Sequence, residues 1–236
     1  MADIMQRILA PDGCLLALEG LRKPITRLNF NLQVELDRDG PPQAMLVHPG
    51  RTLDVFKEMV LPPTYKVVRS EELSLGGSRL GVAQLRIETT LGVPRELVWL
   101  GLQTKTSFLR TSFRGSDQKA AIERFLEIRF EEHETGVVIS NPIVQDERPL
   151  EAIHADGNGV LVTASRLGTL AVKKMTPTNG GLAVQGGQLY ANDGRRRTLT
   201  LVSPTALVKL QSSTATSDRG SDVLTSLGRR LVATWN

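Results

Sequence analysis

Apolar and polar residues alternate with a period of two along much of the chain. The clearest case is residues 28–36, which have apolar residues at Leu28, Phe30, Leu32, Val34 and Leu36. Successive side chains of a strand point to opposite faces, so this pattern predicts a strand with one buried face. Turn residues at Asp37–Pro42 and a second apolar run, Gln43–His48, then predict an antiparallel pair.

Similar short apolar segments, bounded by turn residues, recur in the rest of the chain. We expect strands at Tyr65–Arg69, Leu80–Glu88, Leu97–Thr104, Arg124–Glu131, Gly136–Ser140, Gly159–Ala164, Gly168–Met175, Gly181–Gln185, Thr198–Val202 and Ala206–Leu210. Many short strands with frequent turn signals are typical of all-β proteins, so we predict an all-β sandwich or β-roll.

Helical spacing of apolar residues is confined to three segments. The pattern predicts a short N-terminal helix at Met1–Leu9, a helix at Asp117–Phe125, and an amphipathic helix in the tail from Asp222, with Val223, Leu224, Leu227, Leu231 and Val232 on its apolar face.

These elements predict a single β-rich domain over residues 1–211, with possible halves at 25–115 and 120–211. Residues 212–221 are rich in Ser, Thr, Asp and Gly and are interpreted as a linker to a C-terminal helix at 222–236.

Two segments share a strand, turn, strand, glycine pattern. Leu32-x-Val34 leads to Gly50, and Leu170-x-Val172 leads to Gly187. A duplicated β unit would explain the pattern. The alternative is that any two hairpins of a β protein resemble each other.

Composition narrows the possible functions. Hydrophobic residues make up 40% and charged residues 23% of the 236 residues, as in ordinary globular proteins. Aromatic residues are scarce at 4%, which argues against a stacking platform for single-stranded nucleic acid. The formal charge of +4 permits an acidic partner, RNA or an anionic surface without requiring one.

The distribution of cysteine and histidine does not indicate a metal or disulfide site. Cys14 is the single cysteine, which excludes an internal disulfide and favours a reducing compartment. The three histidines are His48, His133 and His154, and no two of them have metal-ligand spacing. We therefore expect no metal and no cofactor.

The chain has no apolar stretch long enough for a transmembrane helix, and residues 1–10 lack the pattern of a secretion signal. We expect an intracellular location, with mitochondrion and bacterial cytoplasm both left open.

The most distinctive segment is residues 157–193. It contains glycines before two apolar runs, then Val184, Gly187, Leu189 and Ala191 in a Val-x-x-Gly-x-Leu-x-Ala order. This order resembles the repeat unit of the altered-inheritance-of-mitochondria (mitochondrial biogenesis) family of β-repeat proteins. The resemblance implies a scaffold or membrane-organising role. The Gly-rich and Phe-rich segments that join repeats in that family are absent from this sequence.

Pro62-Pro63-Thr64-Tyr65 matches the Pro-Pro-x-Tyr ligand of WW domains. Such ligands dock a polyproline II segment on an aromatic groove. The alternative is a proline-bounded turn before a strand in which Tyr65 packs inward, and the apolar neighbours Val67 and Val68 favour it.

A cluster of basic residues is the strongest charge signal. Its candidate members are Lys173, Lys174, Arg195, Arg196, Arg197, Arg229 and Arg230. If they converge, they would form a patch for phosphate, RNA or an acidic protein. The alternative is a solvated sheet edge, because charged edge strands block unwanted pairing.

No catalytic pattern emerges. The chain has no Gly-x-Ser-x-Gly elbow, P-loop or dinucleotide fingerprint, and Glu131–Glu134 is interpreted as a charged turn. We therefore expect a non-catalytic structural or scaffold subunit of a larger assembly, which associates with other proteins or with itself. The alternatives are a nucleic-acid-associated subunit that uses the basic patch and a viral matrix or coat protein.

Overall fold

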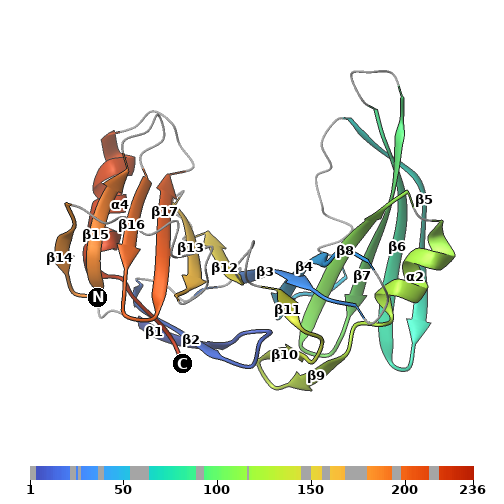
Figure 1. Cartoon of the computed structure of the whole chain (residues 1–236), viewed down its shortest axis with the longest axis horizontal. Coiled ribbons are helices and arrows are strands. Elements are labelled where there is room, and N and C mark those ends of the chain that lie inside the picture. Colours follow the sequence, from blue (N-terminus) through green and yellow to red (C-terminus); the bar gives the residue numbers. More distant parts are fainter. Residues whose placement is uncertain are drawn as a thin grey trace. The chain divides into compact units, whose positions relative to one another are not determined.

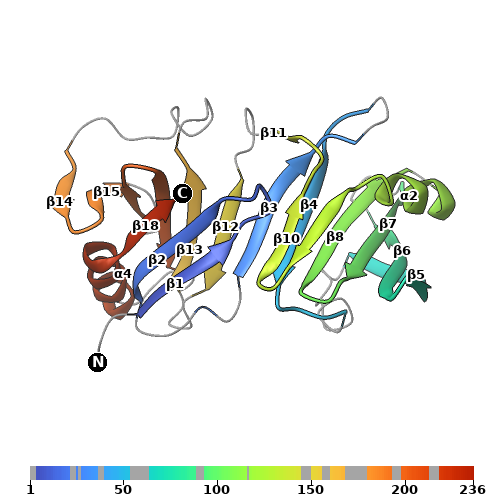
Figure 2. The same cartoon turned by 90° about the horizontal axis from the view of Figure 1, so that it is seen from below.

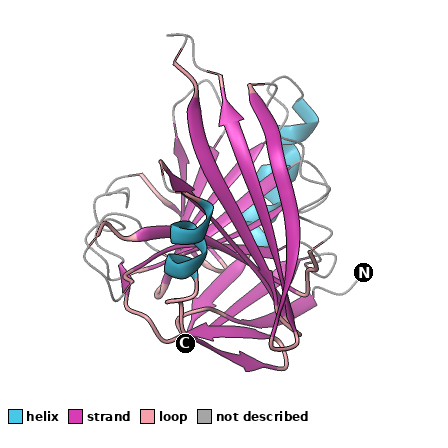
Figure 3. Cartoon of the chain, turned by 90° about the vertical axis from the view of Figure 1, so that its right-hand side faces the viewer, coloured by secondary structure: helices cyan, strands magenta, loops and turns pink. Residues whose placement is uncertain are grey.

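A computed structural model describes residues 4–21, 25, 28–36, 40–53, 64–88, 93–115, 117–144, 150–155, 160–167, 180–192, 198–212 and 218–236. Strands dominate this part of the chain (Figures 1 and 3). They are β1 (Ile4–Leu9), β2 (Leu15–Leu21), β3 (Leu28–Val34), β4 (Gln43–Pro49), β5 (Tyr65–Leu75), β6 (Ser78–Ile87), β7 (Arg95–Gln103), β8 (Ser107–Arg114), β9 (Phe130–His133), β10 (Gly136–Ile139), β11 (Ile143–Val144), β12 (Glu151–Ala155), β13 (Val160–Arg166), β14 (Leu182–Val184), β15 (Gly187–Asn192), β16 (Thr198–Val202), β17 (Ala206–Ser212) and β18 (Val232–Trp235). The helices of the described residues are α2 (Gln118–Phe125) and α4 (Asp218–Arg230).

Thirteen of these strands form one antiparallel sheet. Its order is β14-β15-β16-β17-β13-β12-β3-β4-β8-β7-β6-β5, and β11 pairs with β3 beside this path. A three-stranded sheet has the order β1-β2-β18, and β9 pairs with β10. The mostly β class predicted from the sequence is therefore confirmed.

The chain forms two compact units. Unit 1 consists of Met1–Leu32 and Val144–Asn236, and unit 2 is the continuous stretch Gln33–Ile143. The halves expected from the sequence, 25–115 and 120–211, assume that each unit is continuous in sequence. Those halves stay a prediction; unit 1 combines two separate stretches of the sequence.

The C-terminal residues complete unit 1. β18 pairs antiparallel with β2 (Figure 2), with Trp235 opposite Leu16, and α4 packs against β2, β16 and β17. Leu224 and Leu227 of the helix and Leu231 just after it are almost fully buried. The tail is therefore part of the core of this unit.

Unit 2 has a sheet with two distinct faces, because residues opposite each other on neighbouring strands share a face. One face, which we call the α2 face, carries Phe113, and the guanidinium carbon of Arg124 in α2 lies 5.8 Å from the centroid of that ring. The large buried residues of this face are Met45, Val47, Leu80, Val82, Val98, Leu100, Leu102, Leu109 and Phe113. The opposite side, which we call the Trp99 face, carries a smaller apolar cluster of Ala83, Leu85 and Leu97, against which Tyr65, Ile87 and Trp99 pack.

Several expected elements are confirmed. β3 buries every second residue, as its alternation predicts. α2 begins after Asp117, whose carboxylate accepts a hydrogen bond from the backbone N–H of Ala120 at 2.8 Å.

The N-terminal helix expected at Met1–Leu9 is wrong, because Ile4–Leu9 forms β1. An isolated helix of nine residues is marginal in water, whereas pairing with β2 buries Ile8 and satisfies the backbone. In addition, the Gln6 side chain accepts a hydrogen bond from the N–H of Ile25 at 2.7 Å, which holds the strand in place.

The tail helix is confirmed, but its expected limits are wrong. α4 begins at Asp218, inside the expected linker, and ends at Arg230. Val232, expected on the helix face, lies in β18, because the backbone there pairs with β2. The strand expected at Arg124–Glu131 is also wrong, since α2 extends to Phe125 and β9 begins at Phe130.

The segment that resembles the β-repeat family contains β13, β14 and β15, with residues 168–179 outside the described part. Gly187 has φ +137°, and a Cβ there would lie 2.1 Å from the carbonyl oxygen of Val202. The glycine is therefore required by close backbone approach. Gly50, its proposed counterpart, has no atom within 4 Å of such a Cβ, and the duplicated unit stays a prediction.

Candidate functional site

Most residues of the basic cluster predicted from the sequence lie outside the described part of the chain. These are Lys173, Lys174, Arg195, Arg196 and Arg197. Arg229 and Arg230 form the end of α4, where Arg229 is exposed and the Nε of Arg230 donates to the carbonyl oxygen of Ser226 at 3.1 Å. Convergence of the seven residues stays a prediction.

The Pro-Pro-Thr-Tyr motif is described from Thr64 onward, and Pro62 and Pro63 lie outside the described residues. Tyr65 is the first residue of β5 and packs, half-buried, against the cluster of Ala83, Leu85 and Leu97. Its ring therefore contributes to packing, as the alternative interpretation of the motif expects.

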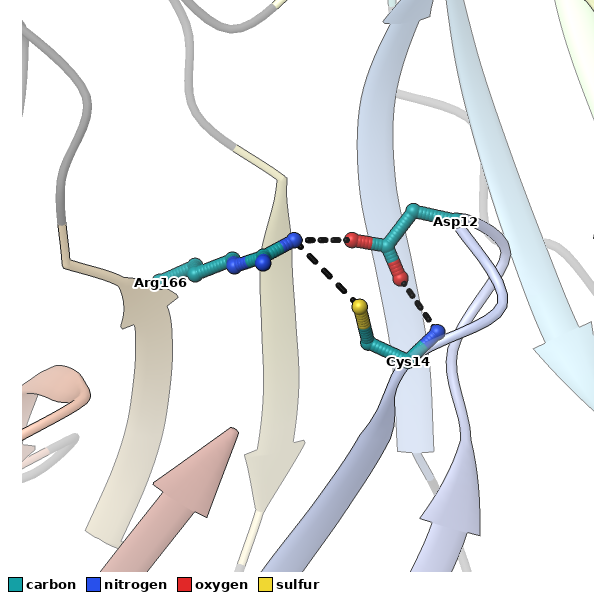
Figure 4. A network of polar contacts seen from close by, with 3 residues as sticks. All are labelled: Asp12, Cys14 and Arg166. Carbon is teal, nitrogen blue, oxygen red and sulfur yellow. Dashed lines mark hydrogen bonds and ion pairs between the residues drawn. The ribbon is translucent and has the colours of Figure 1, made fainter. Parts of the chain in front are cut away.

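The single cysteine belongs to a polar network in unit 1 (Figure 4). One guanidinium nitrogen of Arg166 lies 3.4 Å from the Asp12 carboxylate and 3.3 Å from the Cys14 sulfur. The other Asp12 oxygen accepts a hydrogen bond from the Cys14 N–H at 3.0 Å. These contacts join the turn between β1 and β2 to the end of β13.

The electrostatics of this network do not activate the thiol. Burial and the negative charge of Asp12 raise the pKa of Cys14, and the Arg166 guanidinium offsets part of that rise. A raised pKa keeps the sulfur protonated near neutral pH, whereas a nucleophilic cysteine requires a lowered one. The network is thus best interpreted as structural.

β8, a strand that the sequence analysis did not predict, carries a row of polar residues on the Trp99 face. Arg110, Ser112 and Arg114 lie on this face, opposite Gly101, Trp99 and Leu97 of β7. The intervening residues Leu109, Thr111 and Phe113 are buried on the α2 face. Arg110 is half-buried, whereas Ser112 and Arg114 are exposed.

Arg110 lies above the indole ring of Trp99, with its guanidinium carbon 5.5 Å from the ring centroid. This geometry is a cation–π contact, which aligns the guanidinium with the half-buried ring. Burial lowers the pKa of Arg110, although an arginine remains charged at any physiological pH.

His48 lies on this part of the sheet, opposite Phe108 of β8. It is 4% exposed, and its pKa is lowered to about 4 by burial and by the positive charges of Arg110 and Arg51. The imidazole is therefore neutral at physiological pH, and the two arginines supply the local charge.

The outer strand of the unit 2 sheet is unusually exposed. β5 is eleven residues long, pairs with β6 and stands at the end of the strand order. Its side chains are exposed on both faces, including Val67 at 54%, Val68 at 57% and Leu73 at 36%. A β-bulge between Val67 and Arg69 makes Val68 an extra residue in the strand.

The charged residues of β5 are neutralised within the chain. Ion pairs join Lys66 to Glu88 at 2.5 Å, Arg69 to Glu71 at 2.9 Å, and Glu72 to Arg79 at 2.5 Å. The parts of β5 that are open to a partner are therefore the exposed valines and the outer backbone edge.

Within the described ranges, no group of three His, Cys, Asp or Glu side chains is arranged to hold a metal ion. No described helix is long and apolar enough to cross a membrane. No family model, curated protein or solved structure shows a significant match to this chain.

Proposed function

We propose that this protein is a non-catalytic structural subunit of a larger assembly and that it associates with its neighbours through strand β5. The observation that carries this proposal is the exposure of an eleven-residue edge strand on both faces, with Val67 and Val68 more than half exposed.

An edge strand presents unpaired backbone N–H and C=O groups, which a strand of another chain can pair with. Val67 and Val68 are about half exposed, so completing the burial of each contributes about half the value of a fully exposed valine, or about 1 kcal/mol. Because the charges of β5 are already paired within the chain, a partner can cover the valines without leaving a charge unpaired.

The bulge at Val68 makes the edge selective. Bulges twist an edge strand and interrupt its regular pattern of outward hydrogen-bonding groups, which hinders pairing with an arbitrary strand. A partner shaped to the bulge would bury both valines, so β5 is suited to a specific interface and poorly suited to indiscriminate aggregation.

The experiment compares two variants with the wild type. One carries two added charges on β5, and the other carries one added charge elsewhere on unit 2. Val67→Lys combined with Val68→Lys places charge on the proposed interface. Leu126→Lys places charge on an apolar side chain of unit 2 that is 51% exposed and lies outside β5. Each protein is tagged, recovered from cells of its source at moderate salt, and its associated proteins are quantified, while self-association of the purified chain is measured by sedimentation.

Loss of a defined set of partners, or of self-association, in the β5 variant but not in the Leu126 variant supports the proposal. A wild-type protein that stays monomeric and partner-free would contradict it, as would associations that survive the β5 change.

A further inference from the structure

The charges of β5 are arranged in an order that complements their own reverse. The basic residues Lys66 and Arg69 come first along the strand, and the acidic residues Glu71 and Glu72 follow after Ser70. A second β5 that runs antiparallel to the first therefore places basic residues opposite acidic ones. A parallel copy would place like charges side by side, which is destabilising.

The two innermost charges select a register for such a pair. When two identical strands pair antiparallel, a twofold axis passes between two copies of one residue, and residues equally distant from it face each other. An axis at Ser70 places Arg69 of each copy opposite Glu71 of the other. An axis at Arg69 or at Glu71 would place two identical charges opposite each other. Ser70 is therefore the favoured centre.

The side chains of Arg69 and Glu71 are positioned for these contacts. They lie on the same face of the sheet, because β5 is regular from Arg69 onward and alternate residues share a face. Gln118 of α2 donates a hydrogen bond to one Glu71 oxygen, and Arg69 pairs with the other oxygen at 2.9 Å. The Arg69 side chain is still 65% exposed, so it can reach a second carboxylate while it keeps the first. Two copies would thus join their ion pairs into one ring of alternating charge.

The exposed apolar residues of β5 fit the same arrangement. Val67 and Val68 precede Ser70 and Leu73 follows it, so antiparallel pairing brings the valines of each copy close to Leu73 of the other. Their exposed fractions in the single chain are 54%, 57% and 36%. The interface would cover these side chains in both copies and pair the outer backbone edges as well.

We propose that the partner of β5 is a second copy of this chain, which pairs antiparallel with it about a twofold axis at Ser70. The inference rests on the proposed function of β5 as an interface and names the partner that this interface takes. β5 stands at one end of the strand order (Figure 1). Because the same edge serves both copies, the product is a closed dimer.

The test exchanges charges in the full chain. Arg69→Glu makes both residues beside Ser70 acidic, and Glu71→Arg makes both basic. Each variant alone should dimerise more weakly than the wild type in sedimentation, by about tenfold or more, because its cross-strand pairs change from opposite to like charges. An equimolar mixture of the two variants should recover the dimer, since an acidic strand then meets a basic one.

The matched control reverses an exposed ion pair of unit 2 that lies outside β5. Lys119 and Glu123 of α2 are 3.9 Å apart. Lys119→Glu and Glu123→Arg change the net charge by the same amounts as the two β5 variants, and neither should affect the dimer. Equal losses in the β5 and α2 variants would overturn the proposal. So would a mixture of the β5 variants that stays monomeric although both unfold at the same urea concentration as the wild type.

A disulfide tests the register without any change of charge. In a Cys14→Ser background, Ser70→Cys should cross-link two copies on mild oxidation, because opposite residues of antiparallel strands lie about 4.5–5.5 Å apart at Cα, within the reach of a disulfide. Ser74→Cys is the control on the same face of β5. It would lie roughly 26 Å along the strands from its counterpart and should not cross-link. Equal cross-linking at both positions would overturn the register.

The failure of this inference can be distinguished from the failure of the proposed function. A purified chain that stays monomeric, while cellular partners that depend on Val67 and Val68 are still recovered, would exclude the second copy and leave the β5 interface in place. A dimer that survives both the charge exchanges and the change of both valines to lysine would contradict both proposals. Growth into open-ended polymers would exclude the closed dimer.

Discussion

The carbonyl oxygen of Arg230 lies 2.2 Å from the position that a Cβ atom on Gly20 would occupy. Gly20 also has φ +82°, a conformation that L side chains rarely adopt. At Gly20, β2 therefore lies so close to the end of α4 that no side chain fits between them.

Replacement of Gly20 by alanine should therefore destabilise unit 1 by about 3 kcal/mol or more, because it combines backbone strain with a collision against backbone atoms. Gly180→Ala is the matched control in the same unit, since Gly180 has φ +77° but no atom within 4 Å of its Cβ position. The control should lose only about 1 kcal/mol from strain. Urea unfolding followed by Trp235 fluorescence in a Trp99→Phe background measures both, and equal losses would refute the steric explanation.

Ser203 should contribute to the docking of β18. Its buried hydroxyl donates to the carbonyl oxygen of Ala233 at 2.8 Å and accepts from the N–H of Ala206 at 2.9 Å. Ser203→Ala leaves both backbone groups unsatisfied and should cost about 1–3 kcal/mol, with faster amide exchange in β18.

The control for Ser203 is Ser107→Ala. The Ser107 hydroxyl is also buried, but it has no hydrogen-bond partner among the described residues. The change should be nearly neutral, and a loss as large as that of Ser203→Ala would argue against the hydrogen-bond explanation.

His48 should make unit 2 sensitive to mild acid. Its pKa in the folded chain, about 4, is below its ordinary value of 6.5, so the unfolded chain binds the proton more readily. The contribution of neutral His48 to the free energy of unfolding is fully present above pH 6.5. It falls as the pH drops toward 4 and then levels off, with a total loss of about 3 kcal/mol. His48→Gln should remove this part of the pH dependence, as measured by urea unfolding followed by Trp99 fluorescence in a Trp235→Phe background at several pH values. A parallel pH dependence in wild type and variant would show that other groups cause it.

The reactivity of Cys14 should respond in opposite directions to its two neighbours. Asp12 raises the pKa of the thiol, so Asp12→Asn should lower that pKa and speed alkylation at mildly alkaline pH. Arg166 lowers the pKa, so Arg166→Gln should slow the reaction. Iodoacetamide kinetics over a range of pH report both, because the chain has one cysteine. Denatured samples should react alike, and equal native rates would exclude the electrostatic coupling.

The sequence correctly predicted elements whose pattern is complete within a few neighbouring residues. The alternation from Leu28 to Val34 and the cap at Asp117 both appear in the structure. β18 could not be predicted in this way, because Val232 and its neighbours are a strand only through pairing with β2 at the other end of the sequence. β1 was mistaken for a helix for a different reason: Ile4 and Ile8 have helical spacing, although the partner strand β2 follows directly in the sequence.

The candidate site was missed because β8 does not begin with strict alternation. Phe108 and Leu109 are adjacent and both fully buried, one on the Trp99 face and one on the α2 face. A strand buried on both faces at one end conceals the period of two. The available signal was Arg110, Ser112 and Arg114 at alternate positions. The sequence could not show that they lie beside Trp99, because only the strand register places Trp99 opposite Ser112.

The pairing of β2 with β18 also bears on the order in which the protein is made. Unit 2 is continuous in sequence, so all its strands can emerge from a ribosome and fold while the rest of the chain is still being synthesised. Leu16 must wait until Trp235 has been added, and such a distant contact closes slowly because a long loop must be ordered first. During that interval the apolar residues of β2 lack the cover that β18 and α4 provide in the complete unit.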